Sequence, residues 1–281
     1  MNHASAFDSP KPYGPLIETR LRVVTWNVQG QEGAWRARQP VIANALAAEV
    51  PDLVALQESW ADASGTQAAE LAAHLGLHHA SSAADGAAAS GNAVLSRWPI
   101  VATHHRTLSA RAWGYPRTAA AGEPGLAFAA EIDGPRGPIA LVSVITGPFR
   151  PGQSADRQDQ VRALAEFVAG LPRRALKIVC GDFNAPPDSD EIRMLTGRAA
   201  VPVPGQVFYD AWAIAGTGPG LTWTSANPAA SPALLEDRRI DYVLTPWPRR
   251  GAQGHPVATA LVGTNPPPPS DHYGLRTDLR Y

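Results

Sequence analysis

Short apolar runs alternate with helical patterns in the first part of the chain. Residues 21–28, LRVVTWNV, combine β-branched and aromatic residues and predict a buried strand. The apolar positions between residues 41 and 46 recur at the spacing of one helix face, and Pro51 ends this pattern. The segment 51–58, PDLVALQE, then predicts a second strand. The chain therefore begins as strand, helix and strand.

The same alternation continues to the end of the chain. Further helices are predicted over 65–76 and 154–169, whereas 198–237 is rich in Pro, Gly and Ala and predicts largely irregular structure. The later predicted strands are short and bounded by turn residues: 92–96, 100–108, 126–132, 138–146, 175–180, 221–224, 239–244, 256–262 and 273–279. This pattern predicts an α/β domain of two packed sheets with helices outside.

Length and composition indicate one domain. The chain has 281 residues, 44% of them hydrophobic, with no internal repeat and no linker between two halves. We expect a loose N-terminal arm over 1–20 and a single domain over 21–281. No apolar run reaches the roughly 18 residues of a membrane-spanning helix. The absence of a signal-like start and the single cysteine, Cys180, favour a reducing, cytoplasmic setting without disulfides.

The net charge is −1. A dedicated nucleic-acid-binding protein usually carries an overall basic surface, so any such binding here would need a local basic patch.

Oxygen-bearing side chains stand where predicted strands end. This set comprises Asn27, Glu58, Asp182, Asn184 and Asp271. Sites often form at such strand ends, and hard cations such as Mg²⁺ prefer oxygen ligands. Asp241 stands inside the apolar strand RIDYVL, where a buried carboxylate needs a partner, and His272 is the candidate. A divalent ion among these groups would suit phosphoester chemistry, because it offsets the charge of the phosphate.

Six motifs in order carry a family resemblance: TWNV, LQES, GNAVLSR, GDFNAPPDSDE, RIDYV and SDH. Together they resemble the endonuclease/exonuclease/phosphatase superfamily, which has the fold of deoxyribonuclease I, over about residues 21–280. The resemblance implies a four-layered α/β sandwich with two mainly antiparallel sheets. It also implies Mg²⁺- or Mn²⁺-dependent hydrolysis of phosphoester bonds.

The resemblance also implies roles for individual residues. It implies Glu58 as the principal metal ligand, assisted by Asn27 and Asp271. Asp182 is implied to orient or deprotonate the attacking water, and Asn184 to hold the phosphate. His272 is implied to act on the phosphate or exchange a proton. Asp241 would orient the imidazole ring and favour its charged form. Three further substrate contacts are candidates: Asn92, Arg117 and Arg157.

One position departs from the family pattern. Where the family commonly carries a histidine, before the long helix, this chain has Thr146 in SVITGPFR. A threonine cannot offer a cation to phosphate.

Three hypotheses follow. The first is a metal-dependent phosphoesterase in which water attacks a phosphodiester or a phosphomonoester bond, with a nuclease, and so a nucleic-acid substrate, favoured. The second is a phosphodiesterase or phosphatase that acts on small molecules or phospholipids, without membrane insertion. The third, motivated by Thr146, is a non-catalytic protein that binds phosphate ligands. The sequence indicates no obligate protein partner.

Overall fold

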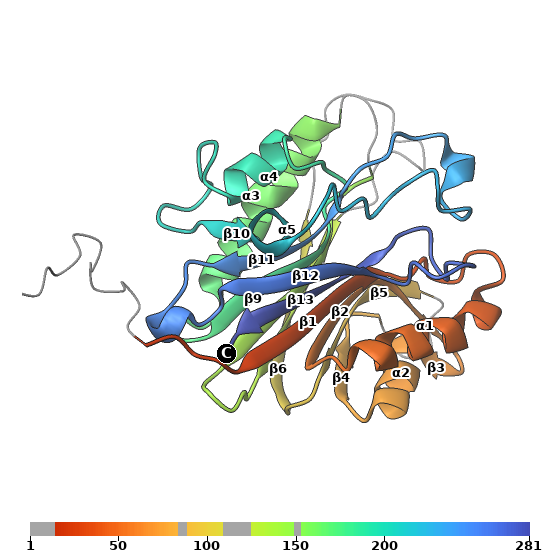
Figure 1. The fold of residues 1–281 in the computed structure, drawn as a ribbon, viewed down its shortest axis with the longest axis horizontal. Coiled ribbons are helices and arrows are strands. Elements are labelled where there is room, and N and C mark those ends of the chain that lie inside the picture. The colour runs from red at the N-terminus through yellow and green to blue at the C-terminus, as the bar shows by residue number, and fades with distance from the viewer. Residues whose placement is uncertain (1–14, 84–88, 109–124, 149–152) are drawn as a thin grey trace, which may run out of the picture.

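The computed structural model describes residues 15–83, 89–108, 125–148 and 153–281, whose strands form two sheets (Figure 1). In order across the first sheet, the strands are β12 (Pro256–Val262), β13 (Gly274–Arg280), β1 (Arg20–Asn27), β2 (Leu53–Asp62), β5 (Ala89–Ser96) and β4 (His78–Ser81), with the short β3 (Gly65–Thr66) on β2. In order across the second, they are β10 (Phe208–Asp210), β11 (Asp241–Pro246), β9 (Leu176–Asp182), β8 (Ile139–Ile145), β7 (Gly125–Ile132) and β6 (Ile100–Leu108).

Both sheets are mainly antiparallel. In the described residues, β1 pairs with β2 in parallel and β8 with β9 in parallel, and the other named pairs are antiparallel. A parallel pair needs a crossover connection, and one helix lies between the two strands of each pair along the chain: α1 between β1 and β2, and α3 between β8 and β9, with bounds as follows. The helices are α1 (Trp35–Glu49), α2 (Gln67–Leu75), α3 (Ser154–Gly170), α4 (Asp190–Leu195) and α5 (Ala211–Ala215).

Three apolar clusters hold four layers together. The middle cluster lies between the sheets and includes Ala55, Leu141 and Leu275. A second lies between the first sheet and α1 and α2, and a third between the second sheet and α3 and α4. Figure 1 shows the two helix pairs on opposite sides of the stacked sheets. The predicted α/β sandwich of two packed sheets flanked by helices is confirmed.

Local sequence explains where α2 begins and ends. The hydroxyl oxygen of Thr66 accepts a hydrogen bond from the amide of Ala69 at 3.1 Å, and Gly76 ends the helix in the left-handed conformation. A side-chain cap of this kind is worth about 1 kcal/mol. Both residues are of the type that favours these positions, so this helix is encoded locally.

Several details differ from the sequence expectation. The predicted strand at 221–224 is instead a single bridge between Trp223 and Arg238. The segment 198–237, expected to be irregular, also contains β10 and α5. Residues 1–14 of the expected N-terminal arm lie outside the described residues, while the amide of Ile17 donates to the carbonyl of Gly251 at 3.0 Å. None of the described helices is both long and apolar enough to cross a membrane.

The strand order brings the candidate residues to one edge. Asn27 ends β1, and Glu58 directly follows Gln57, the last residue of β2 that pairs with β1 in parallel. Asp182, at the end of β9, is directly opposite Asp241, at the start of β11. Because β9 packs against β1 across the sandwich, the two pairs of residues approach each other from different sheets.

Gly181 is required where β9 approaches β8. It has a φ of 147°, and an added Cβ would meet the carbonyl oxygen of Val144, its register partner, far inside van der Waals contact. We expect Gly181→Ala to lower the free energy of unfolding by about 3 kcal/mol or more, as measured by urea denaturation. Gly170→Ala is the control, because a Cβ there meets nothing within 4 Å. Equal urea midpoints for Gly181→Ala and the wild type would contradict the assigned packing.

Candidate active site

A cavity of about 280 Å³ lies at this edge. Its charged and amide side chains come from four separate parts of the chain: Glu58, Asp182, Asn184, Arg238, Asp271 and His272. A cavity of this size is at the low end for small-molecule sites, so it suits a phosphate group and its neighbours better than a large organic ligand.

Glu58 reaches the cavity through a local irregularity in β2. The pairing of β2 with β5 shifts register between Leu56 and Ser59, and Glu58 has a positive φ of 55°. Such a bulge redirects a side chain, and a strained non-glycine backbone commonly marks a functional position. Asn27 donates from Nδ2 to Glu58 Oε1 at 2.9 Å and to Asp182 Oδ2 at 3.2 Å. The Asn27 amide therefore joins carboxylates carried by the two sheets.

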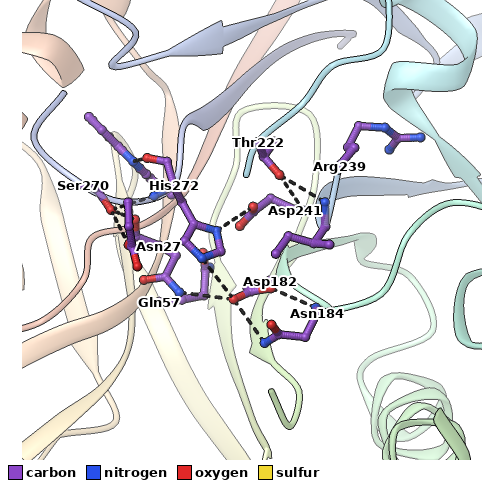
Figure 2. Close-up of polar contacts among 12 residues, drawn as sticks. Asn27, Gln57, Asp182, Asn184, Thr222, Arg239, Asp241, Ser270 and His272 are labelled. Carbon is purple, nitrogen blue, oxygen red and sulfur yellow. Dashed lines mark hydrogen bonds and ion pairs between the residues drawn. The ribbon is translucent and has the colours of Figure 1, made fainter. Parts of the chain in front are cut away.

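Asp182 is buried at the end of β9 and is held by the turn that follows. The backbone amide of Asn184 donates to Asp182 Oδ1 at 2.8 Å, and Asn184 Nδ2 lies 3.3 Å from Asp182 Oδ2 (Figure 2). Asn184 has a positive φ of 47°, which asparagine tolerates better than most residues. The motif GDFN is thus a strand end followed by a turn that orients its own carboxylate.

His272 and Asp241 form a buried pair. His272 Nδ1 lies 2.8 Å from Asp241 Oδ2, and His272 Nε2 lies 3.8 Å from Asp182 Oδ2. Figure 2 shows the imidazole ring between the two carboxylates. The backbone around Asp241 is fixed in turn, because Thr222 Oγ1 accepts hydrogen bonds from the amides of Ile240 at 3.0 Å and Asp241 at 3.2 Å.

The segment that carries Asp271 and His272 is anchored on both sides. Ser270 Oγ donates to the carbonyl of Asn27 at 2.7 Å, and Trp26 Nε1 donates to the carbonyl of His272 at 2.9 Å. These bonds tie the last loop to the end of β1. They place Asp271 and Glu58 on one cavity, although 213 residues separate them in the chain (271 − 58).

Burial and charge set opposite protonation tendencies in this cluster. Burial raises the pKa of Asp182 to about 7, although the positive charge of His272 works against this rise. Burial alone would lower the pKa of His272, but the carboxylates of Asp241 and Asp182 outweigh it and raise the pKa to about 10. His272 is therefore a stable imidazolium at neutral pH, and Nδ1–H donates to Asp241.

Two groups of acidic residues could hold a cation. Oxygen and nitrogen atoms of Asp182, Asp241 and His272 lie within 4.8 Å of one another. The imidazolium offsets one of the two carboxylate charges and has no lone pair for a metal, so we interpret this group as an acid–base cluster. Glu58 and Asp271 offer carboxylate oxygens on the same cavity, and both charges act on the Arg38 guanidinium. This pair fits a hard divalent cation, while the Asn27 amide as placed presents its NH₂ group to Glu58.

Three residues that were candidates for substrate contacts, Asn92, Arg157 and Arg117, are not among the described residues that line the cavity. Asn92 is buried and donates from Nδ2 to the carbonyls of Leu126 and Ser143, both at 3.0 Å, so it bridges the two sheets rather than lining the cavity. Arg157 is also buried, and its Nε lies 3.0 Å from Glu191 Oε1 in an ion pair. It does not line the cavity itself, but its Nη1 donates to the carbonyl of the lining residue Pro148 at 3.1 Å. Arg117 lies outside the described residues.

Thr146 lines the cavity at the place where the family pattern has histidine. Its hydroxyl donates to the carbonyl of Phe183 at 2.5 Å, and its amide donates to the carbonyl of Asp182 at 3.0 Å. Thr146 therefore secures the GDFN turn and brings no charge to the cavity.

Sequence reasoning missed several residues that shape the site. Thr222 orients Asp241, and Arg38 donates from its two terminal nitrogens to carbonyls in the loop after β1 and to Pro269 O at 2.8 Å. Arg238 and Leu235 line the cavity itself. These roles depend on side-chain direction in irregular segments, for which the sequence has no periodic signal. Only Ser270 carried a signal, because it begins the SDH motif.

A family model decides the classification. The model of the endonuclease/exonuclease/phosphatase family matches residues 24–272. The chain belongs to this family. No curated protein matched the sequence.

Solved structures share the fold of this endonuclease/exonuclease/phosphatase protein. A humanized D. rerio TDP2 superposes with a TM-score of 0.70 at 20% identity, covering 93% of this chain and 99% of that one. D. rerio TDP2 complexed with a single-strand DNA product superposes with a TM-score of 0.69 at 19% identity, covering 94% of this chain and 100% of that one. An endonuclease/exonuclease/phosphatase from Beutenbergia cavernae superposes with a TM-score of 0.66 at 24% identity, covering 93% of this chain and 71% of that one.

The charged state of His272 predicts a pH-dependent stability. An unfolded histidine loses its proton near pH 6.5, whereas folded His272 keeps it to about pH 10. The stabilisation that protonated His272 gives the folded state is therefore fully present below pH 6.5. It is lost as the pH rises through the pKa of His272 in the folded protein. We expect the free energy of unfolding of the metal-free protein to fall by about 2 kcal/mol between about pH 7 and about pH 9.

Urea denaturation at several pH values between about pH 7 and about pH 9 measures this fall in the free energy of unfolding. His272→Gln should abolish it, and His79→Gln should retain it, because His79 is exposed on β4. A wild-type free energy that stays constant with pH would contradict the imidazolium.

Proposed function

We propose that the protein is a divalent-metal-dependent phosphoesterase that hydrolyses phosphodiester bonds, with nucleic acid as the favoured substrate. One observation supports it most: Asp182 and His272, the two members of the acid–base cluster that reach the cavity, line it together with the carboxylates of Glu58 and Asp271. Three carboxylates on one small cavity would repel a phosphate, so productive binding requires cations beside them.

Asp182 and His272 are suited to complementary tasks. The pKa of Asp182 lies near neutrality, so this carboxylate can accept a proton from an attacking water. His272 is held positive by Asp241, and its Nε2–H can donate to a non-bridging phosphate oxygen as negative charge develops. Asn184 lines the same cavity and contributes an amide donor to the phosphate.

The proposed reaction is an in-line displacement at phosphorus. The water oxygen forms a bond to phosphorus, its proton passes to Asp182 Oδ2, and the bond to the leaving oxygen breaks. The leaving oxygen then takes a proton from solvent. Glu58 and Asp271 would hold the divalent cation, which supplies Lewis-acid stabilisation of the charge on the phosphate and leaving group.

Two observations bear on the substrate. The family is built on phosphoesterase chemistry, and the similar D. rerio TDP2 binds a single-strand DNA product. The net charge of −1 gives no overall attraction to a polyanion, so a nuclease activity here should depend on local contacts in the cavity.

Turnover of a substrate panel tests the proposal. We expect hydrolysis of plasmid DNA, a single-stranded oligonucleotide or bis(p-nitrophenyl) phosphate with Mg²⁺ or Mn²⁺, and none with EDTA. Asp182→Asn should lower kcat by about 100-fold or more, because a positioned general base contributes a factor of this size. Asp188→Asn, an exposed aspartate of the same segment, should match the wild type.

The panel also separates the alternatives. Hydrolysis confined to p-nitrophenyl phosphate, sugar phosphates or phospholipids would replace the nucleic-acid assignment with the small-substrate one. Absence of turnover with every substrate and both ions, or full activity in Asp182→Asn, would refute the phosphoesterase proposal and favour a phosphate-binding protein.

Metal binding gives an independent prediction for Glu58. Calorimetric titration with Mn²⁺ should show a dissociation constant raised by about 10-fold or more in Glu58→Gln, since even groups that only support metal ligands cost this much when removed. Asp188→Asn should bind Mn²⁺ like the wild type. Unchanged affinity in Glu58→Gln would remove this residue from the metal site.

A further inference from the structure

Arg238 is a cavity residue that the proposed reaction has not used. Its side chain lines the cavity together with Asp182 and His272, yet only 5% of the residue is exposed. Among the described lining residues, Arg238 and His272 are the cationic ones. Burial lowers the pKa of the Arg238 guanidinium, and the negative charges of Glu236 and Asp182 act against that shift.

The position of Arg238 is fixed by its backbone and by a neighbouring ring. Its amide donates to the carbonyl of Trp223 at 2.8 Å, and its carbonyl accepts from the Trp223 amide at 3.0 Å. The guanidinium carbon lies 5.9 Å from the centroid of the Trp223 ring, whose edge contacts the His272 ring with centroids 5.0 Å apart. Arg238, Trp223 and His272 thus form one continuous wall of the cavity.

The adjacent arginine shows a different arrangement. Arg239 forms a buried two-point contact with Asp210, at 3.1 Å from Nη1 and 2.7 Å from Nη2, and stacks on Tyr242. Successive residues of an extended segment point in opposite directions, so Arg239 enters the core while Arg238 meets the cavity. A guanidinium on the cavity lining presents a planar set of donors, which suits the oxygens of a phosphate ligand.

We propose that Arg238 binds a non-bridging oxygen of the substrate phosphate and so provides, with His272, the cationic part of a cavity lining that also carries the carboxylates of Glu58 and Asp271. This assignment rests on the proposed phosphoesterase function. It also gives the cavity a second cationic side chain beside His272, whereas Thr146, on the same lining, brings no charge. The guanidinium remains charged at every working pH, so this contact is constant.

Phosphate affinity tests the assignment without relying on turnover. Inorganic phosphate is titrated calorimetrically into wild-type protein, Arg238→Met and Arg238→Lys, all with MgCl₂ present. We expect Arg238→Met to raise the phosphate dissociation constant by about 10- to 100-fold, the range for losing hydrogen bonds to a charged group. Arg238→Lys keeps the positive charge but lacks the planar set of donors, so its phosphate dissociation constant should lie between those of the wild type and Arg238→Met. Arg198→Met, an exposed arginine elsewhere, should match the wild type.

Kinetic and stability measurements distinguish a loss of phosphate binding from a loss of folding in the Arg238 variants. For a substrate that the wild type hydrolyses, Arg238→Met should raise both the KM and the inhibition constant of phosphate. Thermal unfolding identifies any variant that fails to fold. If Arg238→Met does not fold, Arg238→Lys carries the test. Phosphate binding within twofold of wild type in the folded Arg238 variants, or no phosphate binding by the wild type, would overturn the assignment. A wild type that binds phosphate through Arg238 but hydrolyses nothing would refute the proposed function alone.

Discussion

The contact between Asp241 and His272 is the constraint on which the site depends. A buried carboxylate at the start of β11 is costly unless a positive partner meets it, and the His272 imidazole meets Asp241 at 2.8 Å. That pairing fixes the ring as an imidazolium and directs Nε2 toward Asp182, 3.8 Å away. The same attraction holds the last loop at the cavity that Glu58 and Asp271 both line, so the contact that stabilises the loop also orients the imidazole ring.

The fold spreads this cluster over both sheets. Asn27 and Glu58 come from parallel strands of the first sheet, whereas Asp182 and Asp241 face each other across antiparallel strands of the second. The Asn27 amide contacts Glu58 and Asp182 and thereby links the sheets at the site. Close approach of β8 and β9 at Gly181 lets Asp182 reach this position. The site is therefore as rigid as the packing between the two sheets.

The sequence predicted the layers and the gathering of acidic residues because both depend on local patterns and on ordered motifs. It predicted less where a role depends on side-chain direction. Arg157 was expected at the phosphate, but Glu191 forms an ion pair with it, and no spacing reveals that contact. Asn92 has the residue type of a ligand, yet its amide bridges carbonyls between the sheets. Arg238 stands in an irregular segment, where only the bridge to Trp223 determines that it lines the cavity.

The protonation state of His272 is the central claim, and NMR of the histidine ring nitrogens measures it directly. In ¹⁵N-histidine-labelled protein, the account predicts that both ring nitrogens of His272, assigned by comparison with His272→Gln, carry protons well above the ordinary histidine pKa of about 6.5. In Asp241→Asn, the ring should lose its proton at a lower pH than in the wild type. A wild-type ring that is neutral at about pH 7.5, or one that titrates identically in both proteins, would contradict the account.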